Sequence, residues 1–271
     1  MKSIYTLIPD VQELLTQKGW WTDDTSSYCT SAMGERLRVH YSERDKDRTL
    51  RLSRMGDRCR RQVWYEIHHP DYGESLSASA TFKYAYGHLI EALAITLAKA
   101  AGHTVEGEQD AIILDGVSGH CDCLIDNCIV DVKSSSTRGM AKYKDSNIEE
   151  DDPFGYLDQI DGYVVGDNQT LALNEKKNRQ SGFIWAIDKT LGNMTLYEHH
   201  PRKDHITKRI RDYKHIVSLA EPPECTCETV PRGPRRDLAL GVNASYSPFK
   251  HICFPGLRTE WDRGRPIYYV N

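Results

Sequence analysis

Two short apolar segments, at 120–125 and 128–133, are separated only by Asp126-Asn127, and an acidic residue lies within each of them. An Asp-Asn pair between two β-type segments predicts the tight turn of an antiparallel hairpin. The acids are Asp122 in the first segment and Asp131 in the second. The chain is therefore predicted to build a sheet that brings two carboxylates close together.

A lysine follows the second acid after a single residue, in the run Asp131-Val132-Lys133. Side chains at i and i+2 of a strand share a face, so Asp131 and Lys133 should point one way while Val132 packs on the other side. Paired carboxylates can hold a divalent cation, and a lysine beside them can stabilise an anionic transition state. This combination is suited to phosphodiester hydrolysis.

Helical and extended patterns alternate around this hairpin. The clearest helix is predicted over 82–101, where apolar residues recur every three or four positions before Gly102. Further helices are predicted over 8–21, 50–67, 156–165 and 204–219, strands over 111–114, 183–188 and 194–199, and a polar loop over 134–152. This order predicts an α/β fold whose core is a small mixed sheet flanked by helices.

Composition divides the chain into three regions. Residues 1–80 are predicted to be a helical N-terminal region, and residues 81–221 hold the alternating core. Seven of the eleven prolines lie in residues 222–271, which predicts a loop-rich C-terminal cap.

Basic residues gather in two stretches of a chain whose net charge is −4. Residues 34–61 carry ten Arg and Lys against five Asp and Glu, and a second basic stretch covers 202–214. Locally basic segments can contact phosphates, although solvated helix faces have the same composition. Apolar runs are too short for a membrane span or a secretory signal, so a cytoplasmic protein without membrane contact is predicted.

Two helices carry polar pairs that lie one turn apart. His88 and Glu91 are spaced i, i+3 on the helix that precedes the acidic strands, and Gln159 and Tyr163 are spaced i, i+4 on the helix that follows them. Each pair by itself is common on helix surfaces. Their value lies in the order of the elements.

In that order, the chain resembles the PD-(D/E)XK nuclease superfamily, in particular the RecB-like and phage-type exonucleases related to the CRISPR adaptation nucleases. The matching motifs are Gly87-His88-x-x-Glu91, Gly119-His120-x-Asp122, Asp131-Val132-Lys133 and Gln159-x-x-x-Tyr163, and together they span about residues 82–165. The run from Cys59-Arg60-Arg61 to Tyr65 is similar to the arginine-rich cysteine motif of the RecB-like group.

The resemblance implies a restriction-endonuclease-like core and a role for each matching residue. Asp122 and Asp131 would bind Mg²⁺ or Mn²⁺ with the carbonyl of Val132, Glu91 would complete the site and His88 would assist, Lys133 would position or deprotonate the attacking water, and Gln159, Tyr163, Arg60 and Arg61 would contact DNA. A lysine flanked by carboxylates should stay cationic, which favours electrostatic stabilisation over proton abstraction.

The resemblance also implies a 4Fe–4S cluster, bound by one cysteine upstream of the core and three near the C-terminus. Cys59 and Cys253 match in position, while Ala244 and Ser247 stand where two of the family's cysteines are expected. Cys225 and Cys227 are the candidates to replace them. Four thiolates could instead bind zinc, and a degenerate site with free thiols is the alternative.

Three functions agree with these features. The first is a metal-dependent DNA exonuclease of phage type, acting in recombination, repair or DNA degradation, for which the resemblance implies a recombinase or single-strand annealing protein as a partner and an oligomer as an assembly. The second is a structure-specific or single-strand endonuclease on the same core. The third, from another class, is a non-catalytic DNA-binding protein.

Overall fold

A five-stranded mixed sheet forms the centre of the molecule in the computed structural model, which describes residues 2–42, 48–173, 179–262 and 265–270. The strand order is β1-β4-β5-β6-β7, in which β5 and β6 are parallel and the other neighbours antiparallel. The five strands are β1 (Val105–Glu106), β4 (Cys123–Ile125), β5 (Cys128–Ser135), β6 (Gly182–Asp188) and β7 (Met194–His199). The fold is thus mixed α/β.

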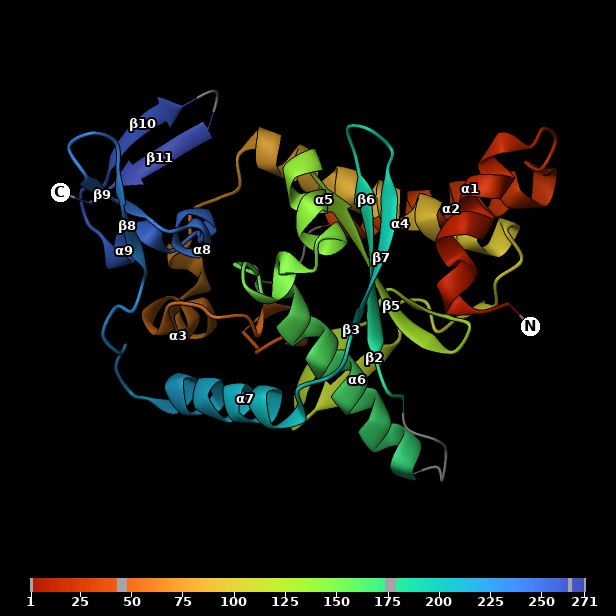
Figure 1. Cartoon of the computed structure of the whole chain (residues 1–271). Helices are drawn as coiled ribbons and strands as arrows, with labels where there is room; N and C mark the ends of the chain where they lie inside the picture. The colour runs from red at the N-terminus through yellow and green to blue at the C-terminus, as the bar shows by residue number, and fades with distance from the viewer. Residues whose placement is uncertain (1, 43–47, 174–178, 263–264, 271) are drawn as a thin grey trace.

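Helices cover both faces of this sheet (Figure 1). The α-helices are α1 (Leu7–Thr16), α2 (Asp23–Tyr41), α3 (Arg60–His68), α4 (Ala78–Ala100), α5 (Thr137–Lys144), α6 (Tyr156–Leu173), α7 (Lys203–Ser218), α8 (Val242–Tyr246) and α9 (Lys250–Cys253). Short 3-10 turns are η1 (Ile4–Thr6), η2 (Leu52–Arg54), η3 (Pro70–Tyr72) and η4 (Asn147–Glu149). Of the helices described, none is long and apolar enough to cross a bilayer.

The alternation of side chains along β5 separates two apolar cores. Val130 and Val132 pack with α1 and α4 on one face, whereas Ile129 joins α5, α6 and α7 on the other. Asp131 therefore points toward the α6 side, as the period of two predicts. Asp126-Asn127 forms the predicted turn between β4 and β5, with positive φ at both residues, as a type I′ turn requires.

The strand predicted over 120–125 is wrong, because two strands of different sheets occupy this segment. β3 (Val117–His120) pairs with β2 (Ala111–Leu114) in a separate hairpin, and β4 pairs with β5. Cys121 and Asp122 lie between them. Asp122 is thus at the point where the chain leaves one sheet for the other, and its carboxylate accepts a hydrogen bond from the Val132 N–H of β5.

Two helices form where polar segments were expected. Thr22 caps α2 by accepting a hydrogen bond from the N–H of Thr25, and Ser136 caps α5 in the same way from Gly139. The helix predicted over 50–67 begins only at Arg60. The backbone of Gly56 runs so close to Gly155 that a Cβ on Gly56 would lie 2.6 Å from the Gly155 Cα, and the chain has no room for a helix there.

The C-terminal region contains more regular structure than its prolines predict. A four-stranded sheet in the order β10-β11-β9-β8 forms beside α8 and α9. Its strands are β8 (Thr229–Arg232), β9 (Asp237–Leu240), β10 (Arg258–Asp262) and β11 (Arg265–Tyr269). This small sheet lies beyond α3, at the opposite end of the molecule from α1 and α2 (Figure 1).

Candidate active site

Two carboxylates and one lysine meet at the start of β4, beside the middle of β5. Lys133 Nζ lies 2.5 Å from Asp131 Oδ2, and the backbone N–H of Val132 donates a 2.7 Å hydrogen bond to Asp122 Oδ2. Asp131 is 1% exposed, and its Oδ2 atom contacts no hydrogen-bond donor among the described residues except Lys133. A buried carboxylate oxygen with so few partners has capacity for a further positive ligand.

The acids raise one another's proton affinity. Burial, followed by the charges of Glu91 and Asp131, raises the pKa of Asp122 well above its usual value. Burial also raises the pKa of Asp131, although Lys133 opposes the shift. Carboxylates whose pKa is raised in this way ionise together only when a further positive charge, such as a bound cation, lies beside them.

Lys133 is held as a cation. Burial by itself would lower its pKa, but the charges of Asp131 and Asp122 outweigh burial and raise it. The ammonium group also donates to Gln159 Oε1 at 3.2 Å and lies 4.9 Å from the centre of the Tyr156 ring. These contacts favour the cationic form of the Lys133 side chain.

Gln159 and Tyr163 reach the site from α6. The Gln159 side-chain amide donates to Asp131 Oδ1 at 2.9 Å and to the Tyr163 hydroxyl oxygen at 2.8 Å. Gln159 is 7% exposed and Tyr163 1%. Their polar groups therefore face Asp131 and Lys133, and little of either surface is open to a ligand.

Glu91 faces the same region from α4, but other side chains hold it. Its Oε1 atom forms an ion pair with Arg36 Nη2 at 2.8 Å and accepts a hydrogen bond from Gln109 at 2.9 Å. Gln109 also lies 3.5 Å from Asp122 Oδ1, so it connects the two acids. His88 Nδ1 is 3.8 Å from Glu91 Oε2.

Gln109 and Arg36 are site residues that the sequence motifs do not reveal. Gln109 has a φ of +59°, a conformation uncommon for residues other than Gly, Asn and Asp, and such backbone strain is frequent at functional sites. Arg36 belongs to the basic stretch 34–61, yet nothing in the sequence connects it with Glu91. Both contacts depend on helix α2 and a turn that approach the acids only in the folded chain.

The predicted DNA-contacting arginines lie elsewhere, at the start of α3. The backbone N–H of Arg60 donates to Thr226 Oγ1 at 3.0 Å, and Arg61 Nε donates to the Pro223 carbonyl at 2.8 Å. These two arginines thus lie beside the C-terminal region and the cysteines.

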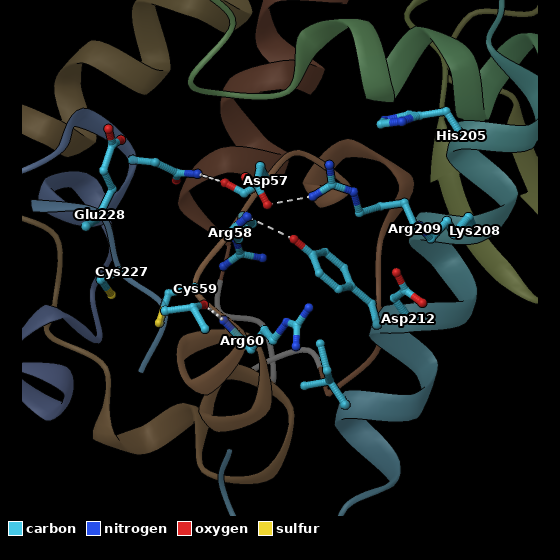
Figure 2. A pocket seen from close by; sticks show the side chains of 15 residues that line it. Asp57, Arg58, Cys59, Arg60, His205, Lys208, Arg209, Asp212, Cys227 and Glu228 are labelled. Carbon is cyan, nitrogen blue, oxygen red and sulfur yellow. Dashed lines mark hydrogen bonds and ion pairs between the residues drawn. The ribbon is translucent and has the colours of Figure 1, made fainter. Parts of the chain in front are cut away.

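A cavity of about 560 Å³ opens between this part of the chain and α7 (Figure 2). Four basic residues line it, with Arg58 and Arg60 on one side and Lys208 and Arg209 on the other, and three acids line it as well, namely Asp57, Asp212 and Glu228. Tertiary structure therefore brings together the two basic stretches, which are separated by about 140 residues in the sequence. Arg44 and Lys46, which also belong to the first stretch, lie outside the described residues.

In the part of the chain that the structure describes, two groups of metal-ligating side chains have their ligand atoms within 4.8 Å of one another. Glu91, Asp122 and Asp131 do not form such a group. One of the two groups consists of Cys59, Cys225, Cys227 and Cys253. The other, Asp158, Asp161 and His205, already has cationic partners. Arg202 Nη2 lies 2.8 Å from both aspartates, and His205 lies 2.7 Å from Asp158 Oδ1, so this group is an ion-pair network.

Comparisons with known proteins give only distant likenesses. No protein-family model matches the chain, and no curated protein matches its sequence. A solved structure of SSO0001 is 16% identical with a TM-score of 0.44, covering 83% of this chain and 95% of that one. The alkaline exonuclease LHK-Exo from Laribacter hongkongensis is 11% identical with a TM-score of 0.37, covering 68% of this chain and 91% of that one. Likenesses at these values establish neither a family nor an activity.

Proposed function

We propose that this protein is a metal-dependent DNA exonuclease of the PD-(D/E)XK type, with its active site at Asp122, Asp131 and Lys133. One observation carries the proposal: the buried Asp131 on β5 lies 2.5 Å from Lys133 Nζ, the half-buried Asp122 accepts the Val132 N–H beside them, and the pKa of both acids is raised by burial. An isolated acid and lysine on a surface would be solvated and would show no such coupling.

The donor set suits Mg²⁺ or Mn²⁺. Asp122, Asp131 and the Val132 carbonyl would hold the ion, since hard cations prefer oxygen ligands and the Asp131 Oδ2 atom has few partners. When bound, such an ion lowers the pKa of its water and neutralises charge on the phosphate. Exposed Gln109 borders Glu91 and Asp122, which leaves this side of the acids open to solvent.

Glu91 would complete the ligand set, directly or through a water molecule, after leaving Arg36 or Gln109. His88 would assist by donating to Glu91 from the next turn of α4. In this proposal, the ion pair with Arg36 holds the Glu91 carboxylate in an ordered position until a metal ion binds.

Lys133 would stabilise the negative charge that develops on the phosphoryl oxygens. Its hydrogen bond with Gln159 and its contact with the Tyr156 ring fix the direction of the ammonium group. Gln159 and Tyr163 would act as positioning residues that hold Asp131 and Lys133 in place. Preorganised charges of this kind lower the barrier without reorganisation during the reaction.

The cavity between α3 and α7, whose lining holds four basic and three acidic residues, would bind the DNA backbone through its basic side chains. Arg60 and Lys208 line it from opposite sides, and Arg61 would support this wall through its hydrogen bond with Pro223. Contacts with phosphates carry no sequence information, which suits a nuclease that degrades DNA of any sequence.

End-labelled single- and double-stranded DNA, incubated with Mg²⁺ or Mn²⁺ over a time course, tests the proposal. An exonuclease releases mononucleotides from linear DNA and leaves covalently closed circles intact. Cleavage of the circles would instead identify an endonuclease on the same core. Binding without cleavage under every metal condition would leave a non-catalytic DNA-binding protein.

A further inference from the structure

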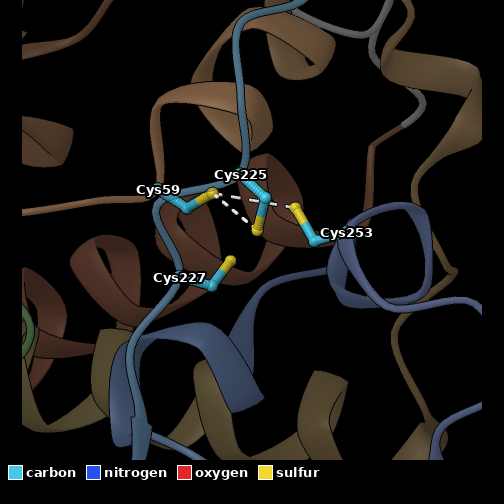
Figure 3. A group of neighbouring side chains, drawn as sticks. All are labelled: Cys59, Cys225, Cys227 and Cys253. Carbon is cyan, nitrogen blue, oxygen red and sulfur yellow. Dashed lines mark hydrogen bonds between the residues drawn. The ribbon is translucent and has the colours of Figure 1, made fainter. Parts of the chain in front are cut away.

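The four cysteine sulfurs converge from three separate segments (Figure 3). Cys59 precedes the first residue of α3, Cys225 and Cys227 lie between α7 and β8, and Cys253 ends α9. All four sulfur atoms lie within 4.8 Å of one another. Cys59 Sγ is 3.8 Å from Cys225 Sγ and 3.7 Å from Cys253 Sγ.

These separations exclude a disulfide between the measured pairs, because bonded sulfurs lie about 2 Å apart. They also disagree with a 4Fe–4S cluster. Each thiolate of such a cluster binds a different iron on the outside of an eight-atom core, so the four sulfurs stand roughly 6 Å apart. The cluster that the family resemblance implies therefore does not fit this group.

A single tetrahedral zinc ion does fit. Four sulfurs at a Zn–S distance of about 2.3 Å form a tetrahedron with edges of about 3.8 Å. The two separations from Cys59 are 3.8 and 3.7 Å. The other sulfur–sulfur separations are at most 4.8 Å, so the four sulfurs need to move only slightly closer together to bind one zinc ion.

The surroundings of the sulfurs also suit thiolates. The side-chain amide of Gln62 donates to Cys227 Sγ at 3.1 Å, a contact of the kind that orients metal ligands and offsets their charge. The two cysteines of Cys225-Thr226-Cys227 flank a residue that turns away, since Thr226 Oγ1 accepts from the Arg60 N–H. Alternating side chains thus let both cysteines reach one centre from a three-residue run.

We propose that Cys59, Cys225, Cys227 and Cys253 bind one structural Zn²⁺ in place of an iron–sulfur cluster. The ion joins the start of α3 to the segment before β8 and to α9, so it anchors the C-terminal region to the rest of the protein. Four protein ligands leave no open position, so the site has a structural role and no part in hydrolysis.

Metal analysis of the full-length protein, purified without oxygen and without added metal, tests the proposal. About one zinc per chain, no iron and no iron–sulfur absorption band are expected, and X-ray absorption at the zinc edge should show sulfur at about 2.3 Å. Replacement of zinc by Co²⁺ should produce the intense visible bands of tetrahedral thiolate coordination. These readouts are independent of nuclease activity.

Variants give a matched comparison. Cys227→Ser should lose the zinc, whereas Cys128→Ser, which changes a thiol outside the group, should keep one ion per chain. The metal content of the unaltered protein decides the matter even where a variant fails to fold. Iron with acid-labile sulfide would overturn the proposal, and so would a folded chain that holds no metal and binds neither Zn²⁺ nor Co²⁺.

Discussion

Lys133 and Asp131 lie on one face of β5 with their charged atoms 2.5 Å apart, while Val132 between them packs into the opposite core. The strand thus places an ion pair between a buried carboxylate and a half-buried ammonium group on the α6 side of the sheet. Both members of this ion pair also interact electrostatically with the second acid, Asp122. The position of the pair beside Asp122 is therefore more important for the proposed chemistry than its contribution to stability.

Lys133→Ala should lower the rate of DNA cleavage by a factor of about 10²–10³, the usual effect of removing one preorganised charge at a transition state. Affinity for DNA should change little, since the cavity between α3 and α7 is untouched. Rates under single-turnover conditions and binding by fluorescence anisotropy measure the two effects. Lys189→Ala, at an exposed turn, is the control. Equal rates for the Lys133 variant and the unaltered protein would refute the active-site assignment.

Asp122→Asn should stabilise the metal-free protein and abolish activity. The pKa of Asp122 is raised in the folded state by burial and by Glu91 and Asp131, so its charged form costs stability as pH rises above the unfolded value. Asparagine removes this cost and keeps an acceptor for the Val132 N–H. A gain of about 1 kcal/mol raises the melting temperature by about 2–4 °C.

Thermal unfolding in EDTA across a pH series measures this effect. The gain from Asp122→Asn should be largest at neutral and alkaline pH and should vanish in acid, where the aspartate is protonated. Added Mg²⁺ should stabilise the unaltered protein more than the variant. A variant that is less stable than the unaltered protein at neutral pH would show that charge repulsion does not dominate at this position.

Gly119→Ala should destabilise the protein, whereas Gly87→Ala should not. A Cβ on Gly119 would lie 2.7 Å from the Tyr163 ring and 2.8 Å from Leu52, both of which are buried. Overpacking of this kind costs about 1–3 kcal/mol. Gly87 lies inside α4 with no atom within 4 Å of such a Cβ, so alanine there should add about 0.5–1 kcal/mol of helix stability. Urea unfolding compares the two variants, and equal effects would contradict the close packing of Gly119.

Asp161→Asn should lower the free energy of unfolding at neutral pH by about 1.5–3 kcal/mol, which is the range for hydrogen bonds with a charged group. Burial would raise the pKa of Asp161, but hydrogen bonds from His199 and the Arg202 N–H outweigh burial and lower it. A lowered folded pKa gives stability that is present above the unfolded value and lost as pH falls through the folded value. The difference between the two proteins should therefore shrink in acid. A difference that stays constant with pH would show that the charge contributes nothing.

Arg60→Ala combined with Lys208→Ala should weaken DNA binding without changing its sequence dependence. Each lost phosphate contact should reduce the slope of log affinity against log salt by about 1. Binding measured at several salt concentrations tests this, with Lys18→Ala combined with Lys189→Ala as the matched loss of two exposed cations. An unchanged slope would mean that DNA follows another path across the surface.

Local sequence determines the parts of this protein that depend on nearest neighbours. The period of two along β5 places Asp131 and Lys133 on one face, and Asp126-Asn127 forms the turn before it because these residues tolerate positive φ. The helical periods of α4 and α6 are equally local. The order of these elements suffices to nominate the acids, the lysine and Gln159 as candidates.

Tertiary structure alone decides what surrounds them. Asp122 lies where the chain changes from one sheet to another, which depends on how both sheets pack. Other contacts join segments that are distant in the chain, namely those of Arg36 and Gln109 with Glu91 and those of Cys59 with Cys225, Cys227 and Cys253. Such contacts depend on how the cores on the two faces of the sheet pack, and no local pattern encodes that. Sulfur separations, which distinguish zinc from an iron–sulfur cluster, exist only once the chain is folded.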